Sequence, residues 1–184
     1  MKAMSSFFVL LHLTLCLTLH PHLIVARQNF GSTLITKACE RSAHQEFCLN
    51  VLNADPNSQT ADLKGLAFNA LRYTSTNVTD TSVFIKQSLS NTDELDPIVE
   101  QALTDCNDVY LSTADLIDDS INALVSNAYP DVDKWVKAAV ANIDTCEASV
   151  TNKTGSALEV SHKNRILRQL CNTALSVVHV LANN

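Results

Sequence analysis

The sequence predicts an all-α protein, an antiparallel up-and-down four-helix bundle preceded by a short helical hairpin. Its composition does not suit a many-stranded sheet, which needs many turns between strands. Only 3 of the 184 residues are glycine and 4 are proline, and aromatic residues make up 5%. Apolar residues recur instead at alternating steps of three and four, the period of helices with one buried face. Pro56, Pro97 and Pro130 lie where helices are expected to begin or end.

Residues 1–26 have the features of a secretory signal peptide. Lys2 precedes an apolar run of 13 residues from Phe7 to Leu19, and Pro21 and Ala26 follow. The run is shorter than the roughly 20 residues that span a bilayer, so we expect cleavage after Ala26 rather than a membrane anchor. The product would be a secreted, extracellular protein.

Cleavage would leave residues 27–184, which is 158 residues and one domain's worth of chain. This segment has 12 basic and 19 acidic residues, a net charge of −7, and it lacks any cluster of Lys or Arg. Nucleic acid and anionic membrane surfaces are therefore poor candidate partners, whereas a basic protein is a good one.

Residues 31–60 are expected to form the helical hairpin, outside the bundle. Cys39 and Cys48 are nine residues apart, and one continuous helix would hold them about 13.5 Å apart. Because bridged alpha carbons lie within about 7 Å of each other, a disulfide between these cysteines requires a bend in the chain.

Residues 61–184 are expected to form the bundle, and its first helix comes from region 62–89. One short apolar stripe runs over residues 63–71, and Val83, Phe84 and Leu89 form another. The second helix begins with Asp96 as its cap and Pro97 in its first turn, and its stripe continues to residue 124.

The third helix follows the break at Tyr129 and Pro130, with an apolar stripe over residues 132–150. The fourth opens at Ser156, where Glu159 three residues later predicts a capping box, and its stripe ends near residue 181. Amphipathic helices joined by such short polar loops are typical of an antiparallel bundle.

The rise of a helix then predicts the second disulfide. If the turn between the second and third helices centres near Ser126, Cys106 and Cys146 are each about 20 residues from it and stand level across the pair. Cys171 is about 13 Å out of level with both, too far for a bridge. We therefore expect it to remain a half-buried, unreactive free thiol.

Metal and catalytic sites are not indicated. The chain has no Cys-x-x-Cys pair, its histidines are scattered, and it lacks phosphate-binding glycine loops and nucleophile elbows. No cofactor is expected, and the carboxylates resemble an ordinary solvated face. Asn77-Val78-Thr79 and Asn152-Lys153-Thr154 are glycosylation sequons in stretches that resemble loops.

Several short motifs, in this order, resemble the plant invertase and pectin methylesterase inhibitors. They are Ile35-Thr36-Lys37-Ala38-Cys39, Phe47-Cys48-Leu49, Leu52-Asn53-Ala54-Asp55-Pro56-Asn57-Ser58, Ala61-Asp62-Leu63-Lys64-Gly65-Leu66-Ala67, Ala102-Leu103-Thr104-Asp105-Cys106 with Tyr110, and Thr145-Cys146-Glu147. The resemblance covers essentially the whole chain after the signal peptide. It implies a four-helix bundle with an N-terminal hairpin, the same two disulfides, and an inhibitor rather than an enzyme.

The resemblance favours pectin methylesterase (pectinesterase) as the target. Invertase inhibitors typically carry a Pro-Lys-Phe element before the third helix, and here that stretch is Tyr129-Pro130-Asp131. Ser126-Asn127-Ala128-Tyr129 and Leu170-Cys171 look more like the pectin methylesterase branch. The resemblance implies a non-covalent 1:1 complex in the apoplast or cell wall, with the bundle lying across the enzyme's cleft.

The resemblance also implies where that enzyme would bind. Asp108 and Asp115 match acidic positions of the pectin methylesterase branch, Ser112 stands where an acid is common, and Thr145 completes the expected interface. Ala148 replaces another acid. Two other hypotheses stay open: inhibition of an acid invertase (beta-fructofuranosidase), and a secreted carrier that holds an apolar ligand between its helices.

Overall fold

The computed structural model of this chain describes residues 31–90 and 95–184, and within these residues the protein is helical without strands. Residues 31–39 are helical and precede α2 (Gln45–Ala54), the 3-10 turn η1 (Ser58–Thr60), α3 (Leu63–Ser90), α4 (Pro97–Val125), α5 (Tyr129–Val150) and α6 (Ser156–Ala182). The all-α prediction is confirmed. The predicted signal peptide, residues 1–26, lies outside the described residues.

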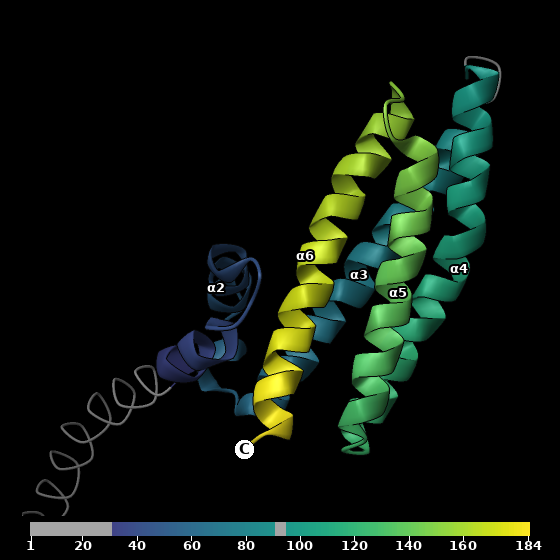
Figure 1. Cartoon of the computed structure of the whole chain (residues 1–184). Coiled ribbons are helices and arrows are strands. Elements are labelled where there is room, and N and C mark those ends of the chain that lie inside the picture. The colour runs from purple at the N-terminus through teal and green to yellow at the C-terminus, as the bar shows by residue number, and fades with distance from the viewer. Residues whose placement is uncertain (1–30, 91–94) are drawn as a thin grey trace, which may run out of the picture.

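Helices α3 to α6 form the four-helix bundle that the sequence predicts (Figure 1). Each helix packs against two neighbours, so that the order around the bundle is α3, α4, α5, α6 and back to α3. The core is one stripe from each helix, and its largest fully buried members include Leu71, Tyr110, Ile117, Ile143 and Leu167. Burial of these stripes is the main force that holds the helices together.

The turn between α4 and α5 lies at Ser126 to Ala128, where the sequence places it. Asn127 adopts a left-handed conformation with φ of 59°. The ammonium group of Lys64, on α3, donates to the Val125 carbonyl at 2.9 Å and to Asn127 Oδ1 at 2.7 Å. Lys64 thus supplies a positive charge and a hydrogen bond to the carbonyl end of α4, where helix polarity favours a cation.

Two predicted helix starts have different outcomes. Asp96 caps α4 as expected, because its side chain accepts a hydrogen bond from the Ile98 amide at 2.8 Å. The capping box at Ser156 is wrong: Gly155 is the N-cap residue of α6, and no side chain caps that end. Gly155 has φ of 61°, which glycine adopts without strain. The helix therefore begins one residue earlier than a serine cap requires.

Helix α3 is a single helix of 28 residues, although its sequence shows only two short stripes. Val83 was expected to face the core, yet it is 46% exposed, and the buried positions of α3 beyond Leu71 are Thr74, Val78, Thr81 and Ile85. The hydroxyls of Thr74 and Thr81 donate to the carbonyls four residues earlier, at 2.9 and 2.7 Å. Because these hydroxyls are satisfied within the helix, both threonines can be buried.

The hairpin contains the disulfide between Cys39 and Cys48, with alpha carbons 5.7 Å apart. Residues 40–44 form the bend that this bridge requires. The hairpin contacts α3 and α6 (Figure 1), and the Ser176 hydroxyl donates to the Ala38 carbonyl at 2.5 Å. A beta carbon on Gly31 would lie 2.0 Å from the Gln59 carbonyl oxygen, so this close approach requires glycine.

Polar contacts join α5 to α6 on the outside of the bundle. Arg168 on α6 forms an ion pair with Asp144 on α5, and His179 Nε2 forms a hydrogen bond with Asp133 Oδ1 at 2.8 Å. Lys137 also pairs with Asp133, at 2.7 Å. Burial acts to raise the pKa of Asp133, but the hydrogen bonds from Lys137 and His179 outweigh it, so the net result is a lowered pKa.

Candidate functional site

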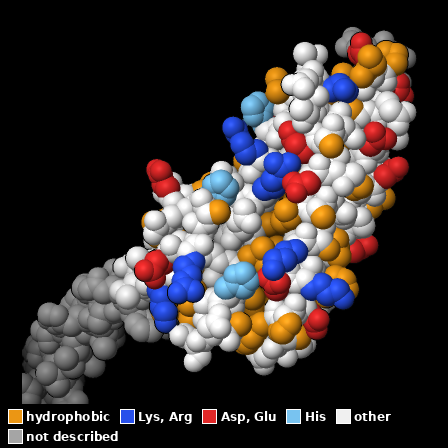
Figure 2. All heavy atoms as spheres, in the orientation of Figure 1, with side chains coloured by type: hydrophobic (Ala, Val, Ile, Leu, Met, Phe, Trp, Pro, Cys, Tyr) orange, Lys and Arg blue, Asp and Glu red, His pale blue; other side chains and the backbone are white. Residues whose placement is uncertain are grey.

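Helix α4 carries an unusual concentration of negative charge. Its 29 residues include six acidic residues and no lysine, arginine or histidine. The adjacent α5 adds four acidic residues and two lysines, whereas α3 and α6 each contain three Lys or Arg residues and one acid. Figure 2 shows acidic side chains along the edge that α4 forms and basic side chains mainly over α5 and α6. The bundle therefore has an acidic side.

Three of the four residues expected to bind an enzyme lie on one exposed face of α4. Asp108, Ser112 and Asp115 are spaced by four and three residues and are all exposed. Asp108 and Asp115 make no hydrogen bond or ion pair with any residue in the described ranges, so both carboxylates remain available for a partner. Leu111, which sequence reasoning did not include, lies among them and is 52% exposed.

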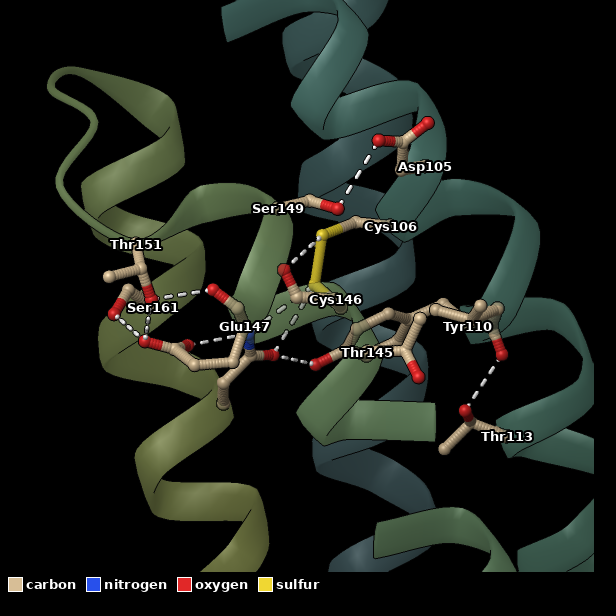
Figure 3. The surroundings of a disulfide bond; sticks show 12 residues. Asp105, Cys106, Tyr110, Thr113, Thr145, Cys146, Glu147, Ser149, Thr151 and Ser161 are labelled. Atoms are coloured by element: carbon tan, nitrogen blue, oxygen red, sulfur yellow. Dashed lines mark hydrogen bonds between the residues drawn. A yellow bond between two sulfur atoms is a disulfide. The ribbon is translucent and has the colours of Figure 1, made fainter. Parts of the chain in front are cut away.

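Thr145 lies on α5, beside the contacts that lock α5 against α4. The disulfide between Cys106 and Cys146 holds their alpha carbons 4.5 Å apart. On either side of it, Ser149 donates to Asp105 at 3.2 Å and Asn142 donates to the Ser112 hydroxyl at 3.0 Å. Figure 3 shows the bridge and the Ser149 contact.

Thr145 is exposed, and its hydroxyl donates to the Ala141 carbonyl within α5. The structure therefore carries all four expected interface residues on two adjacent, cross-linked helices. We call the set Asp108, Leu111, Ser112, Asp115 and Thr145 the acidic face.

A buried polar network lies behind the disulfide. The Tyr110 hydroxyl donates to Asn164 Oδ1 at 2.6 Å, and Asn164 Nδ2 donates to Glu147 Oε2 at 2.9 Å. Glu147 Oε1 accepts from Ser161 at 2.6 Å and from Thr151 at 3.4 Å (Figure 3). Burial raises the pKa of Tyr110, which keeps its hydroxyl a donor. The network fixes α4, α5 and α6 in register at the level of the disulfide.

Cys171 is the free thiol that the sequence predicts, but it is completely buried rather than half-buried. Desolvation by burial raises the pKa of the thiol to about 12. Because the thiolate is the reactive form, this cysteine is inert in the folded protein. Within residues 31–90 and 95–184, no three His, Cys, Asp or Glu side chains are grouped as a metal site requires.

The two sequons lie in different surroundings. Asn152 is exposed in the turn between α5 and α6, with φ of 62°. Asn77 was expected in a loop, but it lies in the middle of α3, and its amide donates to the Tyr73 carbonyl at 2.8 Å. Its surroundings lack proline and glycine, and the helix continues through its polar residues. None of the described helices is long and apolar enough to cross a membrane.

A cross-linked helical bundle with one exposed acidic face fits a protein that acts by binding a basic macromolecule. The chain belongs to the plant invertase/pectin methylesterase inhibitor family, whose family model matches residues 33–177. It is therefore an inhibitor protein of this family and not an enzyme. The family is named for inhibitors of two classes of enzyme, invertases and pectin methylesterases, and membership alone does not choose between them.

Its relatives include inhibitors of both classes. The chain is 30% identical over 176 residues to cell wall / vacuolar inhibitor of fructosidase 2 of Arabidopsis thaliana, covering 95% of this chain and 96% of that protein. It is 27% identical over 148 residues to a pectinesterase inhibitor of Actinidia deliciosa, covering 80% and 79%.

A solved structure has the same fold. The crystal structure of mutant form A of a pectin methylesterase inhibitor from Arabidopsis matches with a TM-score of 0.70 at 24% identity, covering 79% of this chain and 95% of that one. At this identity the similarity establishes the fold.

Proposed function

We propose that the chain inhibits pectin methylesterase by binding non-covalently, as a 1:1 complex, across the enzyme's active-site cleft. The observation that carries the proposal is the acidic face, where Asp108 and Asp115 are exposed without partners in the described ranges. Two unpaired carboxylates on a rigid helix can meet basic groups of an enzyme without first breaking contacts of their own.

Leu111 gives the acidic face an apolar centre. Protein interfaces typically have an apolar core with a polar rim, and a few central residues supply most of the binding free energy. Leu111 is flanked by Asp108 and Asp115 one turn away on either side. In this proposal Leu111 contributes buried area, whereas the two carboxylates set the orientation and the rate of association.

Acid invertase is a second candidate target, and one observation favours it. The similarity to the fructosidase inhibitor of Arabidopsis spans nearly the whole of both chains, more than the similarity to the Actinidia pectinesterase inhibitor. Against it, the first turn of α5 is Tyr129-Pro130-Asp131, which has neither the lysine nor the phenylalanine of the Pro-Lys-Phe element that invertase inhibitors typically carry.

The place of action is proposed from the predicted signal peptide and from the name of the Arabidopsis relative. A signal peptide over residues 1–26 would send the chain out of the cell, and residues 27–184 would be the inhibitor domain. The name of the Arabidopsis relative gives both cell wall and vacuole, and we propose the cell wall. Asn152, exposed in a turn, is the more accessible of the two sequons for a glycan.

The test is to titrate the oxidised protein against a pectin methylesterase and against an acid invertase, measuring ester hydrolysis and sucrose hydrolysis. We expect the esterase to lose activity at lower inhibitor concentration. An inhibitor that slows only the invertase would transfer the function to the second candidate, and one that slows neither would refute both.

The role of the acidic face is tested with Asp108→Asn/Asp115→Asn. These changes keep side-chain shape and remove two charges, so we expect weaker inhibition and a weaker dependence on salt. Asp80→Asn/Glu46→Gln is the matched control, because both of its residues are exposed and lie on α3 and α2. Equal inhibition by the two double variants would show that the acidic face does not bind the enzyme.

A further inference from the structure

A hollow of about 850 Å³ lies between the hairpin and the first half of α3, within the size range of ligand sites. Its lining comes from α2, η1, the residues between them, and α3 from Phe68 to Thr76. We call it the hairpin groove. No residue of α4 or α5 lines it, so it is separate from the acidic face.

The lining of the hairpin groove combines aromatic rings with amides. Phe47, Phe68 and Tyr73 supply the rings, and the exposed fractions of Phe68 and Tyr73 are 37% and 51%. Asn50 and Asn69 supply amides, and the only hydrogen bond found for them in the described ranges is from Asn69 Nδ2 to Ser58 at 3.3 Å. Free amide groups act as both donors and acceptors, which suits a ligand rich in hydroxyls.

Arg72 is the only basic residue that lines the hairpin groove. It is exposed, and within residues 31–90 and 95–184 its guanidinium forms no ion pair or hydrogen bond. The single acid of the lining, Asp55, is occupied locally, since its Oδ1 accepts from the amide and the side chain of Asn57 at 2.9 and 3.0 Å. The groove thus offers one free cation of the kind that binds carboxylate in bidentate fashion.

We propose that the hairpin groove binds an oligosaccharide that carries carboxylate groups. The apolar C–H face of a sugar ring would pack on Phe68 or Tyr73, the amides would bind its hydroxyls, and Arg72 would bind a carboxylate. A purely apolar ligand would cover the guanidinium of Arg72 and the amides of Asn50 and Asn69 without giving them partners, so it fits less well. The proposal does not depend on which enzyme the acidic face binds.

The test is to add trigalacturonate, and separately the neutral galactotriose, to the isotopically labelled, oxidised protein and follow its backbone amide resonances. Trigalacturonate should shift resonances of α2, η1 and residues 68–76, and it should bind at least about tenfold more tightly than the neutral sugar. Arg72→Gln should weaken binding about tenfold. Lys86→Gln, with the same charge change about 21 Å further along α3, should have no effect.

Three outcomes would overturn the proposal. They are no binding up to about 10 mM sugar, equal binding by Arg72→Gln and the parent, and resonance shifts outside the groove. Arg72→Gln should leave enzyme inhibition unchanged, so the groove and the acidic face can fail separately.

Discussion

Removing the hydroxyl of Tyr110 should destabilise the protein measurably, although it deletes a single atom. Tyr110 is fully buried, and its hydroxyl lies 2.6 Å from Asn164 Oδ1, which is buried as well. In Tyr110→Phe this acceptor stays buried without its donor, which costs about 1–3 kcal/mol. We expect a loss of about 2 kcal/mol in the free energy of unfolding, or about 4–8 °C in melting temperature for a domain of this size.

The double variant Tyr110→Phe/Asn164→Leu separates the hydrogen bond from general packing. Asn164→Leu alone takes away the acceptor of the buried Tyr110 hydroxyl, and it removes the donor to Glu147. Glu147 keeps its bonds from Ser161 and Thr151. In the double variant neither Tyr110 nor Asn164 leaves an orphan group, so its loss should be smaller than the sum of the single losses by about 1–2 kcal/mol.

The assay is urea unfolding followed by far-ultraviolet circular dichroism, with the denaturant slope required to stay the same in all variants. Tyr73→Phe is the control, because its hydroxyl has no hydrogen bond in the described ranges and its side chain is exposed; it should change stability by less than about 0.5 kcal/mol. If Tyr110→Phe behaved like Tyr73→Phe, or if the two core changes were additive, the network would not stabilise the fold.

Three further changes probe other parts of the fold. Lys64→Met should lower the free energy of unfolding in urea by about 1 kcal/mol, because the end of α4 loses its cation; an unchanged midpoint would contradict this role. Cys171, buried and with a pKa raised to about 12, should react with a thiol reagent only in denaturant. Stoichiometric labelling of the native protein would refute its burial. The pKa of Asp133 is lowered in the folded state. Its ionised form therefore stabilises the protein at pH values above the pKa of the unfolded state, and this stabilisation is lost as the pH falls through the pKa of the folded state. The melting temperatures of the parent and Asp133→Asn should therefore differ at pH 5 and converge near about pH 2, whereas a constant difference would exclude the ionised pair as its cause.

The bundle was predictable because helical geometry is regular. The stripes of α4 and α5 show their periods plainly, and Asp96 with Pro97 gives a local start signal. The pairing of Cys106 with Cys146 follows from the rise per residue and the position of one turn. Local rules of this kind need no knowledge of the neighbouring helices.

The burial pattern of α3 could not be predicted by counting apolar residues. Thr74 and Thr81 occupy core positions because each hydroxyl is satisfied inside its own helix, and a hydrophobicity pattern treats both as polar. The predicted start of α6 was wrong for a related reason. Ser156 and Glu159 fit a capping box, but the left-handed conformation of Gly155 decides where the chain enters the helix.

Of the two candidate sites, the sequence indicates the acidic face but not the hairpin groove. The positions Asp108, Ser112 and Asp115 came from resemblance, and the regular spacing of α4 places them on one face. Leu111 could have been found as a leucine that lies off the apolar stripe of its helix. The hairpin groove could not be predicted from the sequence, because it forms only when the hairpin packs beside Arg72. No local sequence pattern reports how a hairpin docks on a bundle.

The charge distribution shows that the acidic face does not serve stability, which agrees with the binding role that we propose for it. Asp115 and Asp119 are four residues apart on α4, and like charges at this spacing destabilise a helix by about 0.2–0.5 kcal/mol. A helix with six acids and no Lys, Arg or His has no compensating pairs of its own. Neutralising Asp108 and Asp115 should therefore leave the protein at least as stable as the parent while it inhibits less well. A substitution that raises stability while it weakens inhibition identifies a residue that the partner requires and the fold does not.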